Sequence, residues 1–259
     1  MSESSEAPLL VERRDAALIL TINRPEIRNA IDQATANAIA AAIDRLESDP
    51  ELSVGVITGA GSGFCAGMDL KAFAATGIRP WGGDRGFAGI VRRPPAKPMI
   101  AAIEGFAVAG GFEIALACDL IVAAKGAKIG VPEVKRSLVA AGGALLRLSQ
   151  RFPREIATEM ILTGDLISAD RAFELGAISR LSEPGSALED ALGLAATIGA
   201  NGPLALVASK QIMDGKDDWP AAEFWDRQDE IVIPVFESDD AREGALAFAE
   251  KRPARWSGR

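Results

Sequence analysis

The sequence predicts an α/β protein with a helical C-terminal region. Short apolar segments alternate with helical patterns over the first part of the 259-residue chain, and from about residue 142 the spacing of apolar residues is helical throughout. Runs of strands with interspersed helices, followed by helices alone, are typical of an α/β core with a helical appendage. We expect residues 1–200 to form the core and residues 201–259 to form the C-terminal helical region.

The first predicted elements are a hairpin, a helix and a buried strand. Residues 8–22 contain the charged turn ERRD and then AALILTI, which indicates a hairpin arm leading into a buried strand. Asp32 is the expected N-cap of an Ala-rich helix that extends to residue 48, where apolar residues recur at helical spacing. Residues 53–58, SVGVIT, are short and rich in valine, isoleucine and threonine, which predicts a second buried strand.

A glycine-rich loop, GAGSGFCAGMDL, follows the second strand. Asp69 in this loop is expected to cap the helix that comes next. Residues 74–98 then contain several prolines and glycines, together with Trp81, and show no regular period. We predict this segment to be the most mobile loop of the chain.

The core resumes with four predicted strands, PMIAAIEG, GFAVA, DLIVAA and AKIGV. The strand GFAVA gives way to a helix at the pair Gly110-Gly111. The segments GALLRLSQRF, PREIATEMILTG, SADRAFELGAI and SALEDALGLAATIGA are expected to be helices, with a break at residues 181–184. The C-terminal helical segment is expected to begin at residues 201–203.

The bulk composition disfavours several classes of protein. A net charge of −8 disfavours a nucleic-acid partner, because nucleic-acid-binding proteins usually carry a basic patch. No apolar run approaches the length of a membrane span, so we expect no membrane partner. The polar N-terminus does not resemble a signal peptide, which predicts a cytoplasmic location. Cys65 and Cys118 lie in apolar runs and are expected to be reduced core residues.

The chain has no histidine and no tyrosine. This composition excludes a Ser-His-Asp or Cys-His nucleophile and any histidine-ligated metal site. The proton carriers of an acid/base enzyme with this sequence must therefore be Asp, Glu, Lys or Cys side chains.

The segment 105–133 holds the strongest candidates for chemistry. Glycines at a strand-to-helix turn leave backbone N–H groups free to stabilise a developing oxyanion, although a lone Gly-Gly is more often only a tight turn. Glu113 follows among apolar residues, where burial would raise its pKa, although a first-turn glutamate can simply complement the helix dipole. Glu133 follows Pro132 and is equally consistent with a solvated turn residue.

The upstream loop, residues 63–70, is similar in composition to an anion-binding loop. It is neither a Walker A sequence nor a dinucleotide fingerprint, because the required glycine and lysine spacings are absent. Lys71 is placed where it can reach a phosphate, although the loop alone favours a solvated side chain.

Together these motifs resemble the crotonase, or enoyl-CoA hydratase/isomerase, superfamily over nearly the whole chain. The resemblance rests on five runs in a specific order and spacing, namely NRPEIRNA, ITGAGSGFCAGMDL, KPMIAAIEGFAVAGGFEIALACDLIVAAKGAKIGVPE, LTGDLISADRAFELGAI and DDAREGALAFAEKR. It implies a spiral of repeated ββα units with C-terminal helices that build a homotrimer, and two trimers commonly stack into a hexamer.

The resemblance also implies roles for particular residues. The backbone N–H groups of Met68 and Gly110 would hold the thioester oxygen of an acyl-CoA substrate. The positions that would line the path of coenzyme A are Arg28, Ala30, Ala66, Asp69, Leu70 and Lys71, with Phe248 and Lys251 closing over the nucleotide, sometimes from a neighbouring subunit. No permanently bound cofactor and no metal is implied, since coenzyme A is part of the substrate.

Glu113 and Glu133 match the two catalytic glutamates of the hydratases. The resemblance implies that Glu113 activates water for attack on the β-carbon of a 2-trans-enoyl-CoA, and that Glu133 delivers a proton to the α-carbon. The same site would dehydrate a 3-hydroxyacyl-CoA, because the step is reversible. A role in fatty acid β-oxidation is the expected metabolic setting.

Two departures affect the expected acyl preference. The common hydratases carry Pro-Gly-Ala-Gly-Gly-Thr-Gln-Arg where this chain has AAGGALLR at residues 140–147. The segment 73–93 varies within the family, and Trp81 is either part of the acyl entrance or an anchor of a surface loop. The alternatives to a hydratase are an enoyl-CoA isomerase and a dehydratase of a carnitinyl, steroid side-chain or aromatic-pathway thioester. An RNA-binding homologue is disfavoured by the acidic helix at residues 32–48.

Overall fold

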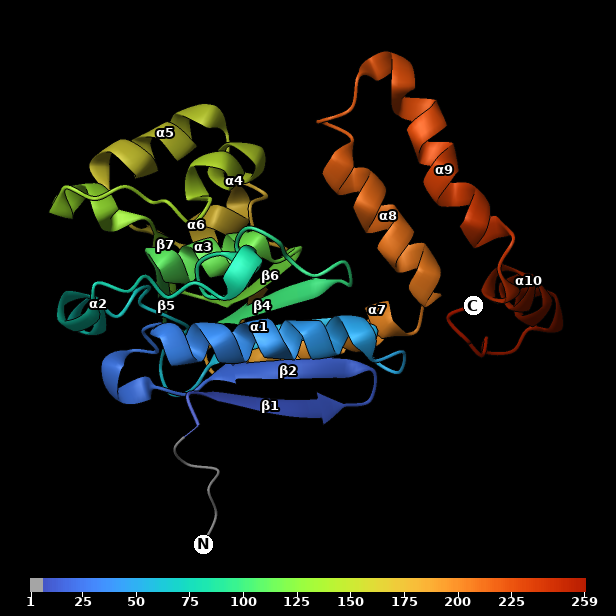
Figure 1. Ribbon diagram of the computed structural model, residues 1–259, viewed down its shortest axis with the longest axis horizontal. Coiled ribbons are helices and arrows are strands. Elements are labelled where there is room, and N and C mark those ends of the chain that lie inside the picture. The colour runs from blue at the N-terminus through green and yellow to red at the C-terminus, as the bar shows by residue number, and fades with distance from the viewer. Residues whose placement is uncertain (1–6) are drawn as a thin grey trace, which may run out of the picture.

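The computed structural model describes residues 7–259 and confirms the α/β class, with two sheets and a set of C-terminal helices (Figure 1). Within these residues the larger sheet has six strands. β1 and β2 pair in antiparallel fashion, and every later neighbour in the sheet is parallel. In spatial order the strands are β1 (Leu9–Arg14), β2 (Ala17–Ile22), β3 (Val54–Gly59), β4 (Met99–Ile103), β6 (Leu120–Ala124) and β9 (Arg180–Ser182).

Strand β2 shows why the large sheet is covered on both faces. Its residues are almost all buried, and successive side chains point to opposite faces of the sheet. Leu18 and Leu20 join the main hydrophobic core, whereas Ala17 and Ile19 pack on the other face against helix α7 (Ala187–Gly199). An apolar run without polar alternation therefore forms a strand that is buried on both sides, as the sequence predicts.

The smaller sheet contains β5 (Phe106–Val108), β7 (Lys128–Gly130) and β8 (Ile167–Ser168). The pair β5 and β7 is parallel, and β7 and β8 are antiparallel. The chain enters this sheet directly from β4, since only two residues separate β4 from β5. Helix α3 (Gly110–Ala117) follows β5, and all of its residues are buried, most of them in the main hydrophobic core.

Helix α1 (Gln33–Ser48) lies along the large sheet (Figure 1). Asp32 is its N-cap, because the Asp32 side chain accepts a hydrogen bond from the Thr35 N–H at 2.8 Å. The sequence predicted this cap. The remaining helices before α7 are α2 (Leu70–Thr76), α4 (Ala144–Arg151), α5 (Arg154–Thr163) and α6 (Ala169–Glu174), with short 3-10 helices η2 (Pro25–Ile27), η3 (Gly83–Arg85) and η4 (Pro132–Arg136).

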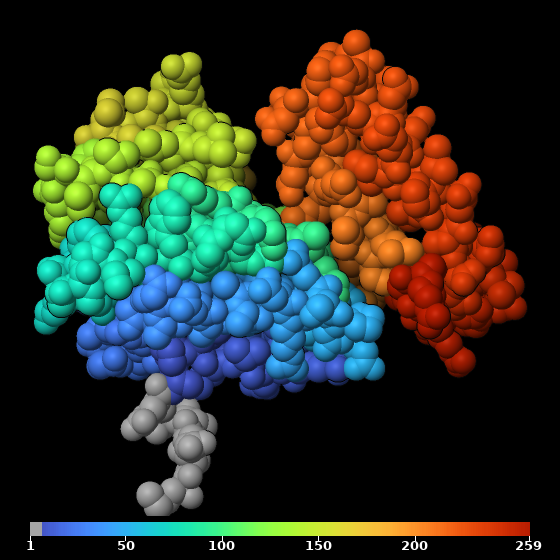
Figure 2. Space-filling view, in the orientation of Figure 1, coloured from blue at the N-terminus to red at the C-terminus, as the bar shows by residue number. Residues whose placement is uncertain are grey.

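The C-terminal helices form a lobe that stands beside the rest of the molecule in this view (Figure 2). Lys210 of α8 attaches the lobe to the core, because its ammonium group pairs with Asp119 at 2.7 Å and donates to the Pro95 carbonyl at 2.7 Å. The lobe contains α8 (Pro203–Gly215), η5 (Ala221–Glu223), α9 (Phe224–Phe236) and α10 (Asp239–Glu250). The division at residue 200 into two units stays a prediction.

Two local expectations about strands were wrong or incomplete. The predicted break at residues 181–184 overlaps the edge strand β9, which pairs with β6 through Arg180, Leu181 and Ser182. The two-residue strand β8 was not predicted at all. Both strands are too short to show a period of their own, and their pairing partners are distant in the chain.

The segment 74–98 packs more closely than its composition indicated. The Arg85 side chain is 2% exposed and inserts toward α1, where it pairs with Asp44 at 2.8 Å and with Glu47. Its guanidinium also donates to the Arg93 carbonyl at 2.8 Å, so it closes the segment on itself. One buried arginine therefore anchors a stretch whose prolines and glycines suggested mobility.

No single helix between residues 7 and 259 has the length and apolar character needed to cross a membrane. Helices α7 and α8 satisfy the length and composition requirement only as a pair, and they are bent by 106° relative to each other.

Candidate active site

The turn before α3 exposes a backbone donor. Ala109 has φ 53° and ψ −132°, a backbone conformation that residues other than glycine rarely adopt. The Ala109 N–H donates to the Gly130 carbonyl at 2.9 Å, which fixes the turn to β7. As the first residue of α3, Gly110 has an N–H with no acceptor among residues 7–259.

A second free donor lies on the upstream glycine-rich loop. The Ile31 N–H donates to the Gly67 carbonyl at 2.8 Å, and the Asp69 N–H donates to the Ile31 carbonyl at 2.9 Å. These bonds bypass Met68, whose N–H finds no acceptor within the described part of the chain. A β-carbon on Gly67 would lie 2.9 Å from the Gly110 nitrogen, so the two loops approach as closely as glycine allows. Two adjacent free N–H groups can hold a developing oxyanion.

Glu113 lies one turn into α3 and is only 4% exposed. Its Oε1 accepts hydrogen bonds from the Gly142 N–H at 2.7 Å and from the Ala144 N–H at 3.2 Å. Burial raises the pKa of Glu113, while these two N–H groups and the charge of Arg147 act in the opposite direction. Glu113 is therefore a buried carboxylate with donors that favour its ionised form.

Glu133 lies in η4 and has a different environment. Its Oε2 is buried and has no hydrogen-bond partner among the described residues. The pKa of Glu133 is raised to about 7, chiefly by burial and also by the negative charge of Glu113, while its own backbone N–H and Arg136 act in the opposite direction. The two carboxyl groups are close enough to influence each other electrostatically, and Glu133 holds a proton more readily than an ordinary glutamate.

The groups that hold Glu113 were missed by sequence reasoning. The stretch 140–147 was connected only with the acyl preference, yet its backbone supplies both donors to the Glu113 carboxylate. Arg147, in α4, places its guanidinium against Gly143 and donates to the Val91 carbonyl at 2.7 Å. A glycine pair immediately before a helix was the available signal, because it marks free N–H groups at a helix start.

The structure brings together six of the residues predicted to contact coenzyme A. The Ala66 N–H donates to the Arg28 carbonyl at 3.0 Å, which joins the two loops that carry them. Arg24 reinforces the junction, because its guanidinium donates to the Ala30 carbonyl at 2.6 Å and pairs with Asp69 at 3.2 Å. The six residues are Arg28, Ala30, Ala66, Asp69, Leu70 and Lys71.

Asp69 also has the structural role that the sequence predicted. Its Oδ1 accepts from the N–H groups of Lys71 at 3.1 Å and Ala72 at 3.0 Å, so it caps α2. The Lys71 side chain is exposed and Leu70 is 48% exposed. These two side chains are available to a ligand, whereas the Asp69 carboxylate is already engaged.

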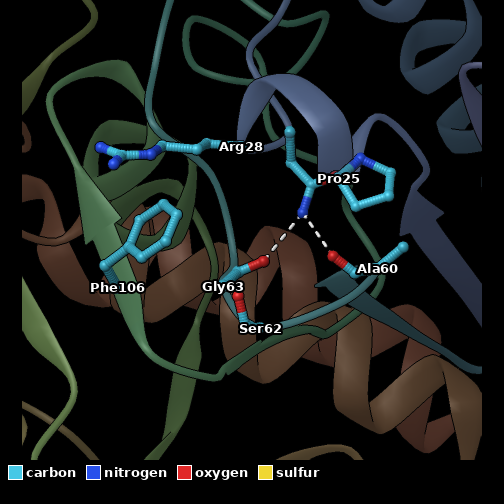
Figure 3. A pocket seen from close by; sticks show the side chains of 7 residues that line it. Pro25, Arg28, Ala60, Ser62, Gly63 and Phe106 are labelled. Atoms are coloured by element: carbon cyan, nitrogen blue, oxygen red, sulfur yellow. Dashed lines mark hydrogen bonds between the residues drawn. The ribbon is translucent and has the colours of Figure 1, made fainter.

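A cavity of about 300 Å³ lies beside this junction (Figure 3). The Asn29 amide nitrogen closes part of its wall by donating to the carbonyls of Ala60 at 2.9 Å and Gly63 at 2.8 Å. The lining residues are Pro25, Arg28, Asn29, Ala60, Ser62, Gly63 and Phe106. The exposed Arg28 side chain gives one side of this cavity a positive charge.

Phe248 and Lys251 are not brought to the same place within one chain. Both belong to the end of α10, which lies at the opposite end of the molecule from α2 and Lys71 (Figure 1). Phe248 is 87% exposed, and Lys251 is also exposed. Within the described chain, these two residues therefore lie apart from the six residues on the other loops.

The cysteines are separate core residues, as predicted. Cys65 and Cys118 are both buried and free. Burial raises the pKa of each thiol to about 12, so neither is a useful proton carrier near neutral pH. Within residues 7–259, no group of three or more cysteine, aspartate or glutamate residues could hold a metal ion.

Comparison with known proteins gives a consistent family. The chain matches the enoyl-CoA hydratase/isomerase family model over residues 12–259. It is 43% identical to an enoyl-CoA hydratase of Mycobacterium tuberculosis, over 96% of both chains. It is 40% identical to a carnitinyl-CoA dehydratase of Salmonella typhimurium, over the full length of both chains.

Solved structures agree in fold. The crystal structure of an enoyl-CoA hydratase from Mycobacterium marinum is 54% identical and superposes with a TM-score of 0.94, covering 98% of this chain and all of the other. A carnitinyl-CoA hydratase from Mycobacterium avium is 42% identical and has a TM-score of 0.79, with 98% and 100% coverage.

Proposed function

The chain belongs to the enoyl-CoA hydratase/isomerase family and has its crotonase fold, and we propose that it catalyses the reversible hydration of a 2-trans-enoyl-CoA to a 3-hydroxyacyl-CoA. It is an enzyme of the carbon–oxygen lyase class. The observation that carries the proposal is a pair of carboxyl groups with different environments, the buried Glu113 and the half-buried Glu133, together with two free backbone donors.

The proposed reaction uses the two glutamates in different protonation states. The Glu113 carboxylate takes a proton from water, and the resulting hydroxide forms a bond to the β-carbon. The electron pair of the double bond moves through the α-carbon onto the thioester oxygen. The protonated Glu133 then delivers its proton to the α-carbon, which restores the thioester carbonyl.

The charge that develops on the thioester oxygen is held by the N–H groups of Met68 and Gly110. A donor of this kind is worth roughly 3–4 kcal/mol of transition-state stabilisation in comparable sites. Ala109 contributes indirectly, because its strained conformation orients the N–H of Gly110. Return to the starting state requires one proton to leave Glu113 and one to return to Glu133.

Coenzyme A enters this scheme as part of the substrate, and the family typically works without a separate cofactor. We place its path along Arg28, Ala30, Ala66, Asp69, Leu70 and Lys71. The cavity beside Arg28 supports this placement, because its positive wall suits the phosphate-bearing part of coenzyme A.

The remaining functional expectations extend this proposal. We propose a homotrimer or a hexamer of two trimers, with Phe248 and Lys251 completing the nucleotide site of a neighbouring copy. A cytoplasmic location and the lack of nucleic-acid or membrane partners stay predictions from the sequence.

A second candidate is the dehydration of a carnitinyl-CoA or of another specialised 3-hydroxyacyl-CoA. The observation that favours it is the full-length 40% identity to a carnitinyl-CoA dehydratase. The same carboxyl pair serves both reactions, since dehydration is the reverse of hydration. An enoyl-CoA isomerase is less well supported, because moving a double bond does not require a second glutamate to activate water.

The test is to replace each glutamate by glutamine and to follow the loss of enoyl thioester absorbance with crotonyl-CoA. Each of Glu113→Gln and Glu133→Gln should lower kcat by at least about 10²-fold, with little change in the affinity for butyryl-CoA. Rates near wild type in both variants would overturn the two-carboxylate mechanism. Carnitinyl-CoA is assayed in parallel to separate the two candidate substrates.

Glu104 provides a matched control for the same substitution. Its carboxylate also accepts backbone hydrogen bonds, from Gly185 at 3.1 Å and Ala187 at 2.9 Å, but these lie at the start of α7. Glu104→Gln should keep the rate of crotonyl-CoA hydration close to that of the wild type.

A further inference from the structure

The ring of Phe87 lies directly against the candidate oxyanion hole. A β-carbon placed on Gly110 would be 2.6 Å from both Cε1 and Cζ of Phe87. The ring therefore covers the α-carbon of Gly110, which is bonded to the donor nitrogen. Phe87 is half-buried and also packs against the main hydrophobic core.

The backbone around Phe87 is held rigidly. The Ala88 N–H donates to the Pro80 carbonyl at 2.9 Å, and the Gly82 N–H donates to the Gly86 carbonyl at 2.9 Å. These bonds close a short loop whose tip carries the buried side chain of Arg85. The Phe87 ring is consequently a fixed wall, because a phenylalanine side chain has only two rotatable bonds and its backbone cannot move freely.

The course of the segment places Phe87 on the acyl side of the thioester. Four residues further on, the Val91 carbonyl accepts from Arg147, whose guanidinium lies against Gly143. The neighbours of Gly143 donate to Glu113. The segment thus runs from Phe87, beside the oxyanion donor Gly110, to Val91, which holds Arg147 next to the loop that supports Glu113. The loops that carry Arg28 and Lys71, where coenzyme A is expected, are not part of this segment.

We propose that Phe87 is a specificity-determining residue that restricts the substrate to enoyl thioesters without a branch at the α-carbon. This inference rests on the proposed function, because the N–H groups of Met68 and Gly110 must hold the thioester oxygen. The α-carbon is then two bonds from that oxygen, within reach of the ring beside Gly110. A methyl group on the α-carbon meets the Phe87 ring. A hydrogen atom at the same position leaves the thioester carbonyl free to enter the oxyanion hole.

The experiment compares crotonyl-CoA with 2-methylcrotonyl-CoA in the full-length protein. The wild type should show a kcat/KM for the branched substrate that is at least about 50-fold lower, within the range that one methyl group can produce in a shaped pocket. Phe87→Ala should raise the branched-to-unbranched ratio by at least about 10-fold, and Phe87→Leu should give an intermediate ratio. Thermal unfolding checks that each variant is folded, and Phe87→Leu keeps the test available if Phe87→Ala is not.

Trp81→Ala is the matched control from the same segment. Trp81 stacks under the guanidinium of Arg92 at 4.1 Å from the ring centre, and it is 36% exposed. Loss of this side chain removes an aromatic ring from the loop without uncovering Gly110. The ratio of kcat/KM for 2-methylcrotonyl-CoA to that for crotonyl-CoA should therefore stay within about twofold of the wild-type ratio. A Phe87→Ala ratio that also stays within about twofold, with crotonyl-CoA still hydrated, overturns the proposal.

A binding measurement separates failure of this proposal from failure of the hydratase function. The dissociation constants of butyryl-CoA and 2-methylbutyryl-CoA are measured by calorimetry for the wild type and Phe87→Ala. The wild type should bind the branched thioester at least about 10-fold more weakly, and the variant should lose that difference. A wild type that hydrates neither substrate but shows this difference contradicts the proposed function and supports the role of Phe87. Equal affinities in the wild type overturn the role of Phe87.

Discussion

Glu113 and Glu133 differ in what their carboxyl oxygens contact. Glu113 accepts two backbone N–H groups and faces the positive charge of Arg147, so its ionised form is supported despite burial. Glu133 has a buried oxygen that finds no hydrogen-bond partner within residues 7–259, so its neutral form is favoured. Two carboxyl groups of the same type can therefore serve as base and acid near neutral pH.

This difference predicts a bell-shaped dependence of kcat/KM on pH. A base must be ionised, so activity should fall as pH drops through the pKa of Glu113, which burial raises above that of an ordinary glutamate. An acid must be protonated, so activity should also fall as pH rises through the pKa of Glu133, about 7. The profile is measured with crotonyl-CoA from about pH 4 to about pH 9.

The pH profile of the residual activity of Glu133→Gln shows which group produces the alkaline limb. Glutamine does not titrate, so the alkaline limb near pH 7 should disappear while the acidic limb remains. An alkaline limb that survives in this variant would assign that titration to another group. Because the two carboxyl groups interact, the apparent pKa values measured from the profile belong to the pair and not to either glutamate alone.

At the scale of elements, the start of α4 is as important as α3 for positioning the Glu113 carboxylate. The loop before α4 places two backbone donors on the Glu113 carboxylate. In this chain Gly142 lies against that carboxylate, because a β-carbon on Gly142 would lie 2.4 Å from Oε2 of Glu113. The stretch that departs from the family pattern therefore holds Glu113 through its backbone, with no side chain at position 142 between them.

Gly142→Ala should accordingly displace Glu113 and weaken both hydrogen bonds. We expect kcat for crotonyl-CoA hydration to fall by roughly 10²-fold, the typical effect of a misplacement of about 1 Å. Binding of butyryl-CoA should change little, because the oxyanion donors and the coenzyme A path are untouched. Steady-state kinetics with calorimetry measures both quantities.

Gly193→Ala is the control for a glycine-to-alanine change. Gly193 is inside α7, and a β-carbon there would meet no atom within 4 Å. This variant should keep full activity and gain about 0.5–1 kcal/mol of unfolding free energy, because alanine is the better helix former. If Gly142→Ala were as active as Gly193→Ala, the backbone donors of the α4 loop would not matter for catalysis.

At the scale of the whole molecule, one chain holds the carboxyl pair but only part of the predicted coenzyme A site. Lys71 and the cavity beside Arg28 lie toward one end, and α10 with Phe248 and Lys251 lies toward the other (Figure 1). A strongly exposed phenylalanine near the end of a helix is consistent with a surface that another copy covers. The proposed oligomer would join these two halves.

Complementation between two variants tests this arrangement. Lys71→Glu and Lys251→Glu should each raise the KM for crotonyl-CoA about tenfold, because each reverses a charge expected near the phosphates. Refolding the two variants together should restore native KM in about a quarter of the sites if each site draws on two copies. Sites confined to one chain would show no recovery.

Lys216→Glu is the matched control, since Lys216 is exposed and pairs with its exposed neighbour Asp217 at 2.6 Å. Its KM should equal that of the wild type. Sedimentation analysis of each protein checks that the variants keep the same oligomeric state, so that a change in KM reports on the site itself.

Much of the fold and the locations of the candidate site residues could be predicted from the sequence. Asp32 and Asp69 were identified as helix caps, and the long apolar strands were found, because caps and continuous apolar runs are local signals. The absence of histidine alone narrowed the proton carriers to a few side-chain types. The strands β8 and β9 were missed, because two or three residues carry no period of their own.

The sequence by itself determined the fold class and the family resemblance, and it singled out Glu113 and Glu133 as candidates for acid/base chemistry. Only the tertiary structure decided how those glutamates differ, because pKa values depend on burial and on partners that are distant in the chain, such as Gly142 and Ala144. It also decided that Phe87 lies over Gly110 and that Arg85 anchors the loop carrying Phe87 to α1. These contacts join separate segments, and no local pattern of residues encodes which distant segments will meet.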